Sequence, residues 1–113
     1  MKKAIIFGGS RGIGKAIAES LNSLDVEIIA TSKQDVDTSN LESVRKFSEK
    51  NNSVDILVLN TGGPPVIEFN KISEDDWNRY HNQLFVGFCT ILQNIKVNHD
   101  GYIFLISSNV IKE

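Results

Sequence analysis

Seven residues near the N-terminus, Gly8-Gly9-Ser10-Arg11-Gly12-Ile13-Gly14, have the types and spacing of a phosphate-binding turn. They follow a short apolar run, residues 4–7, which is typical of a strand buried on both faces of a parallel sheet. From Gly12 the apolar residues recur every three or four positions, which indicates a helix. Backbone amides at a helix N-terminus bind phosphate, and glycines let a pyrophosphate approach the main chain. The strand–turn–helix context therefore favours a dinucleotide-binding turn over a merely flexible one.

The alternation of strand and helix signals continues along the rest of the chain and must position this turn. Apolar runs predict further strands, and three- or four-residue spacing predicts helices that lie between them. The predicted strands are 4–7, 26–30, 54–59 and 102–106, and the predicted helices are 12–21, 41–50 and 74–95, the last with Ser73 as its N-cap. Such repeats are βαβ units, so we expect one α/β domain over residues 1–113, a Rossmann-type doubly wound parallel sheet with helices on both faces.

Composition excludes several classes of function. Among 113 residues, Lys and Arg number 12 and Asp and Glu 14, and no basic run offers an electrostatic footprint for nucleic acid. No apolar stretch approaches the roughly 20 residues needed to span a bilayer. Cys89 is the only cysteine, and His81 and His99 have no second ligand at metal spacing, so we expect no metal site. The chain is therefore expected to be cytoplasmic, without nucleic-acid or membrane partners.

The G-x-x-x-G-x-G spacing, with Ile13 between the last two glycines, resembles the turn of the short-chain dehydrogenase/reductase family. The resemblance continues in register along the chain. Asn60-Thr61-Gly62-Gly63 stands where the family has its Asn-Asn-Ala-Gly loop, and Trp77 and Gly87 have the spacing of the family's central helix. The run that continues through Pro64-Pro65 is similar to that of a subgroup of 3-oxoacyl-carrier-protein reductases.

The resemblance implies a set of functional residues. Ser108 stands in the place of the family's catalytic serine, and Asp37 in that of the aspartate that contacts adenine. The implied cofactor-binding residues are Gly8, Ser10, Arg11, Gly12, Ile13, Gly14, Ser32, Lys33, Asp37, Asn60 and Gly62. From the residues alone, Arg11 and Lys33 could equally be surface charges, Asp37 a turn residue and Ser108 a serine that hydrogen-bonds loop backbone.

Two basic residues favour one cofactor over another. Arg11 and Lys33 flank the position expected for the ribose 2′-group, where an acidic residue would favour NAD and basic groups suit a 2′-phosphate. The prediction is therefore NADP, with NAD as the alternative.

The chain also departs from the family pattern. Phe7 replaces the usual threonine before the first glycine, and Leu84 occupies the position of the relay asparagine. The neighbouring Asn82 and Gln83 are expected to point elsewhere on the helix. Residues 33–37 are too few for the usual helix, so this edge of the sheet should be abbreviated. The Tyr-x-x-x-Lys pair would lie beyond Glu113, so the resemblance covers only the first half of the family's domain, a truncated Rossmann fold.

The resemblance implies an NAD(P)H-dependent carbonyl/alcohol oxidoreductase, which in a full-length form would act on a small-molecule carbonyl or acyl substrate. The chain would be its cofactor-binding half, which by itself is not expected to turn over. Two alternatives stay open, a non-catalytic dinucleotide-binding or assembly module that needs a second chain, and a vestigial fold that acts through interactions alone.

The last predicted strand leads to an expectation of self-association. In a doubly wound sheet this strand should have a further neighbour, and residues 103–106 form an apolar edge without charge or proline. Part of the surface formed by Tyr80, Leu84, Phe88 and Ile91 is expected to face water as well. A homo-oligomer is therefore expected.

Overall fold

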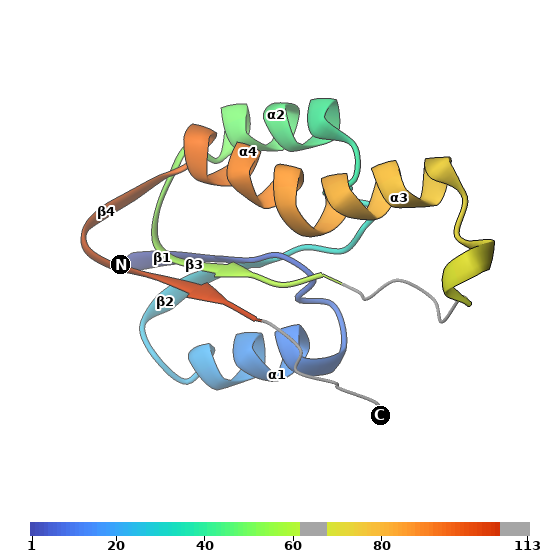
Figure 1. Cartoon of the computed structure of the whole chain (residues 1–113). Helices are drawn as coiled ribbons and strands as arrows, with labels where there is room; N and C mark the ends of the chain where they lie inside the picture. Colours follow the sequence, from blue (N-terminus) through green and yellow to red (C-terminus); the bar gives the residue numbers. More distant parts are fainter. Residues whose placement is uncertain (62–67, 107–113) are drawn as a thin grey trace.

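The computed structural model describes residues 1–61 and 68–106 and has a four-stranded parallel sheet with helices on both faces (Figure 1). The elements are β1 (Lys2–Ile6), α1 (Gly12–Leu21), β2 (Val26–Ala30), α2 (Leu41–Lys50), β3 (Ser53–Leu59), the 3-10 turn η1 (Phe69–Lys71), α3 (Glu74–His81), the π-helical turn η2 (Asn82–Val86), α4 (Gly87–Asn94) and β4 (Lys96–Leu105). The strand order is β2-β1-β3-β4. The predicted α/β fold is confirmed.

The two faces of the sheet are covered unequally. Figure 1 shows α2, α3 and α4 on one face and α1 alone on the other. The main core lies between the sheet and the pair α2 and α4, because the strands direct one set of apolar side chains to that face. Its buried members are Ile5, Phe7, Val36, Val44, Val54, Leu57, Leu59, Phe88, Ile91 and Ile95.

The face beneath α1 retains an apolar groove. Ile17 and Leu21 of α1 and Ile56 and Val58 of β3 line this groove of about 330 Å³ together with residues of β4, Tyr102 and Phe104. Ile13, in the first turn of α1, is 63% exposed.

The connection from β2 to α2 contains no helix and no further strand, which confirms the predicted abbreviated edge. The Asp35 carboxylate accepts hydrogen bonds from the backbone N–H and the hydroxyl of Ser32, which are 2.8 and 3.1 Å long. These bonds close a tight turn shortly after the end of β2. Thr38 is buried by the element that crosses above it.

That element is the predicted long helix, which η2 divides into α3 and α4. Ser73 is its N-cap as expected and forms a capping box with Asp76. A side chain at Gly87 would overlap the backbone oxygen of Thr38, so only glycine permits this close crossing.

Only part of the apolar surface of the long helix faces water, as expected. Phe88 and Ile91 are buried in the core, whereas Leu84 and its neighbour Phe85 are exposed. Trp77, in the first turn of the helix, is 51% exposed and contacts Phe69 edge-to-face.

The strand β4 begins at Lys96, earlier than predicted, and is irregular where Asp100 has a positive φ of 64°. From Tyr102 to Leu105 it pairs in register with β3 on one side. Among the described residues no strand pairs with its other side, and the side chains from Tyr102 to Leu105 are exposed. This agrees with the predicted apolar edge.

Candidate functional site

The glycine-rich turn joins the carboxyl end of β1 to the N-terminus of α1. Gly8 and Gly12 have φ angles of 67° and 61°, a region that L-residues with side chains rarely adopt. A side chain at Gly14 would overlap the backbone oxygen of Gly8, so this glycine lets the helix approach the strand closely. Among the described residues, no atom beyond the neighbours of Gly12 in the chain and the backbone of its own helix lies within 4 Å of the place where a Cβ of Gly12 would be. The turn is therefore tight beneath the helix and open above it.

The end of β3 supports this turn. The side-chain amide of Asn60 donates a hydrogen bond of 3.3 Å to the backbone oxygen of Gly8. The carboxyl ends of β1 and β3 are adjacent because the two strands are parallel neighbours, Ile6 being paired with Val58. Phe7, at the position where the resemblance implies a threonine, is buried and packs edge-to-face on Phe47, with 5.4 Å between ring centres.

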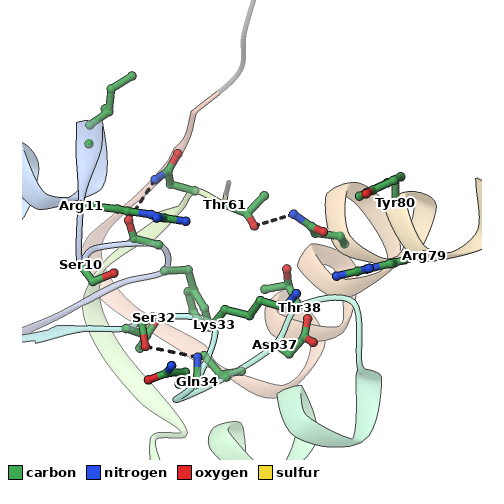
Figure 2. A pocket seen from close by; sticks show the side chains of 18 residues that line it. Ser10, Arg11, Ser32, Lys33, Gln34, Asp37, Thr38, Thr61, Arg79 and Tyr80 are labelled. Carbon is green, nitrogen blue, oxygen red and sulfur yellow. Dashed lines mark hydrogen bonds between the residues drawn. The ribbon is translucent and has the colours of Figure 1, made fainter. Parts of the chain in front are cut away.

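A cavity of about 800 Å³ opens at these carboxyl ends (Figure 2). The structure brings nine of the predicted cofactor-binding residues to its wall, namely Gly8, Ser10, Arg11, Gly12, Ile13, Ser32, Lys33, Asp37 and Asn60. Gly14 is buried beneath the turn rather than in the wall. Gly62, predicted to bind the cofactor, and Ser108, predicted to be catalytic, lie outside the described residues.

Sequence reasoning missed residues from the far side of the cavity. Arg79 and Tyr80 of α3 and Gln83 of η2 line it as well. Figure 2 shows Arg11 and Lys33 reaching into the space from the side of the strands, and Arg79 and Tyr80 on the helix opposite. No local sequence pattern singles these residues out, because their place at the cavity depends on the close crossing of Gly87 over Thr38.

Gln83 and Leu84 differ in direction, as expected for neighbours on a helix. Gln83 lines the cavity, and its side-chain amide donates a 3.1 Å hydrogen bond to the hydroxyl of Thr61. Leu84, which stands where the resemblance implies the relay asparagine, is 43% exposed.

The charges around the cavity are mostly positive. Arg11, Lys33 and Arg79 line it, and Asp37 is the acidic residue of the wall. Within the described ranges, no carboxylate oxygen lies within 4.0 Å of the charged nitrogens of these three cations. The cavity therefore favours an anionic ligand.

Asp37 is ionised in this environment. Burial acts to raise the pKa of its carboxyl group, but the effect is outweighed by hydrogen bonds from the hydroxyl and the backbone N–H of Ser39, 2.6 and 2.9 Å long. The positive charges of Lys33 and Arg79 act in the same direction as these bonds, so the pKa of Asp37 lies below its ordinary value.

The hydroxyl of Ser32 is engaged locally. It donates to Asp35 and accepts a hydrogen bond of 3.3 Å from the backbone N–H of Gln34. Ser32 thus shapes the turn that carries Lys33.

No cluster of three or more potential metal-ligating side chains occurs in residues 1–61 and 68–106. In the same residues no helix is long and apolar enough to cross a membrane.

No family model matches the chain. In sequence it is 29% identical over 140 residues to the 3-oxoacyl-(acyl-carrier-protein) reductase FabG of Chlamydia pneumoniae, an alignment that covers 98% of this chain and 56% of the relative. The chain thus spans about half the length of the curated relative that it matches.

Two solved structures are similar to this chain in fold. A short-chain dehydrogenase from Burkholderia cenocepacia in complex with NADP has a TM-score of 0.82 at 22% identity, covering 92% of this chain and 54% of that one. A metagenomic short-chain oxidoreductase in complex with NADP has a TM-score of 0.77 at 21% identity, covering 99% of this chain and 63% of that one. The chain is therefore similar in sequence to a 3-oxoacyl-carrier-protein reductase and has the fold that short-chain dehydrogenases share over about half of their length.

Proposed function

We propose that residues 1–113 are the dinucleotide-binding part of a short-chain dehydrogenase/reductase, an NAD(P)H-dependent carbonyl/alcohol oxidoreductase. The observation that carries the proposal is the open space above Gly12 at the N-terminus of α1, beside a cavity of about 800 Å³. A pyrophosphate needs this close approach to backbone amides, and the dipole at the helix N-terminus favours its charge.

The first turn of α1 fits such a ligand. Arg11 is the N-cap residue, and within the described part of the chain no side chain caps the helix amides. Those amides are left to a ligand or to water. Gly14 allows the helix to pack against the turn, so that its N-terminus is directed at the cavity. The proposed cofactor-binding residues are those that the sequence predicts, Gly62 among them.

The proposed cofactor is NADP. Arg11 and Lys33 both line the cavity, and the Burkholderia and metagenomic short-chain enzymes are in complex with NADP. The Asp35 carboxylate is held in the turn by Ser32 and does not line the cavity, so Asp37 is the acidic residue of the wall. When bound, the nicotinamide cofactor supplies the hydride for a carbonyl carbon, and the residues of this chain bind and orient it.

The proposed substrate class is a small carbonyl or acyl compound, as the similarity to a 3-oxoacyl-carrier-protein reductase suggests. Ser108 is proposed to hold the carbonyl oxygen. The Tyr-x-x-x-Lys pair that the resemblance implies falls outside residues 1–113. Nucleotide binding by this chain, rather than turnover, therefore tests the proposal.

Calorimetric titration of the chain with NADPH and with NADH is the direct experiment. We expect NADPH to bind more tightly, because Arg11 and Lys33 add attraction for a 2′-phosphate. Gly12→Asp is the matched variant: it places a carboxylate where the pyrophosphate would lie, in open space and at a φ that Asp tolerates better than most residues. It is expected to fold and not to bind. No heat of binding up to about 1 mM of either nucleotide would contradict the proposal.

We also propose that the chain forms a homo-oligomer through β4. The outer side of this strand has no partner among the described strands, and Ile103 and Leu105 are 52% and 63% exposed on one of its faces. Pairing between strands uses backbone groups and does not depend on side-chain identity. An apolar edge without charged residues or proline can therefore pair with the same edge of a second copy.

A further inference from the structure

The long helix directs one row of residues at the cavity. Arg79 and Gln83 line the cavity, and Gly87 lies against the backbone of Thr38. In a regular α-helix, residues four apart differ in direction by about 40°, so a row of three would drift by about 80°. The π turn η2 lies within this row, and its wider turn offsets part of the drift. Arg79, Gln83 and Gly87 therefore lie on the same side of the long helix, and Arg79 is the member of this row nearest to the start of the helix.

Arg79 is held in place by its neighbour. Its guanidinium carbon lies 5.8 Å from the centre of the Tyr80 ring, and Tyr80 is half-buried in the cavity wall. Figure 2 shows the Arg79 side chain extending from α3 toward the loop that carries Asp37 and Thr38. An aromatic ring restrains the guanidinium group without using its N–H donors. Those donors stay available to a ligand.

The cations of the cavity exceed what a pyrophosphate requires. The N-terminal amides of α1 already suit that group. Three basic side chains, Arg11, Lys33 and Arg79, remain, and the Asp37 carboxylate that faces two of them already accepts two hydrogen bonds from Ser39. A second phosphate on the ligand would match this surplus. NADPH carries such a phosphate on its adenosine ribose, and NADH does not.

We propose that Arg79 is a specificity-determining residue that binds the 2′-phosphate of the adenosine ribose from α3, opposite Arg11 and Lys33. This inference rests on the proposed dinucleotide-binding function and deepens it, because it assigns preference for the phosphorylated cofactor to a helix outside the glycine turn and outside the end of β2. The abbreviated connection between β2 and α2 and the contact of Gly87 with Thr38 are what allow α3 to approach the cavity.

The test compares Arg79→Gln with the unchanged chain in titrations with NADPH and NADH. Loss of one charge-assisted contact is expected to weaken NADPH binding about tenfold. NADH affinity is expected to stay the same, because NADH has no 2′-phosphate. Arg79→Lys keeps the charge and is expected to lose less NADPH affinity. Arg45→Gln is the control, since Arg45 is exposed on α2 and pairs only with Glu42 at 3.8 Å among the described ion pairs.

The outcomes separate this inference from the function on which it rests. If the unchanged chain binds neither nucleotide, both are overturned. If the unchanged chain binds NADPH, the proposed function stands. The role of Arg79 is then refuted if Arg79→Gln lowers the affinities for NADPH and NADH equally, or lowers neither affinity. Arg79 is exposed, so the variant is expected to fold, which its melting temperature checks. A selective loss of NADPH affinity at an unchanged melting temperature supports the inference.

Discussion

The Gln83 side-chain amide lies 3.1 Å from the Thr61 hydroxyl, to which it donates a hydrogen bond, and so joins η2 to the residue that follows Asn60. Asn60 in turn donates to the backbone oxygen of Gly8. A chain of two side-chain hydrogen bonds thus runs from the long helix through the end of β3 to the glycine turn. Through it, the position of the helix is coupled to the geometry of the phosphate-binding turn.

Gln83→Leu tests this coupling, because leucine has a similar size and cannot donate a hydrogen bond. We expect the free energy of unfolding to fall by about 1 kcal/mol, the ordinary net contribution of such a bond. NADPH affinity should fall with it, because the loop that holds Gly8 loses a support. Urea unfolding and calorimetry measure the two quantities. Gln93→Leu, at an exposed position of α4, is the control, and an equal effect of both variants would contradict the coupling.

Gly14→Val tests the close approach of α1 to the turn. The added side chain would overlap the backbone oxygen of Gly8, so the helix must move away. We expect destabilisation of roughly 1–3 kcal/mol from overpacking, together with loss of nucleotide binding. Ala16→Val adds branched carbons at an exposed position of the same helix and should change neither property appreciably. A Gly14→Val chain with full affinity and an unchanged melting temperature would show that the turn is not a dinucleotide fingerprint.

The pH dependence of stability reports on Asp37. Its pKa is lowered in the folded chain, so folding favours the ionised carboxylate. This contribution is fully present above the unfolded pKa of about 3.9 and is lost as the pH falls through the lower folded pKa. Asp37→Asn should therefore lower the melting temperature at neutral pH, with a difference that shrinks as the pH falls below about 4. Thermal denaturation of both chains at neutral pH and in acid measures this difference in melting temperature. Asp25→Asn, at an exposed turn, is the control, and a difference for Asp37→Asn that persists unchanged in acid would refute the assignment.

Leu105→Lys tests assembly through β4. A charge on an exposed edge strand opposes pairing between copies, so the average mass in solution should shift toward the 12.6 kDa of one chain. Light scattering at micromolar concentration measures this mass. Leu24→Lys introduces the same charge at another residue of similar exposure, 59% against 63%, and should leave the assembly intact. A monomeric unchanged chain would disprove the proposal, and no response to Leu105→Lys would leave packing through the long helix instead.

Local signals in the sequence predicted the elements that carry the site. The apolar run before Gly8, the periodicity after Gly12 and the cap at Ser73 depend on neighbouring residues alone. The parallel order of the strands followed from the alternation of strands and helices, and it places Asn60 beside Gly8 through the pairing of β1 with β3. Nine of the predicted cofactor-binding residues consequently lie at one cavity.

Tertiary packing alone decided which residues of the long helix face that cavity. The sequence groups Leu84 and Phe88 in one apolar surface, but in the folded chain Phe88 is buried and Leu84 is exposed, while Gln83 reaches Thr61. The crossing of Gly87 over Thr38 lies next to a π turn, and such a turn changes the direction of every side chain on one side of it relative to the other. Because this crossing joins segments far apart in the sequence, no local pattern announces it, and Arg79 became part of the site only in the folded chain.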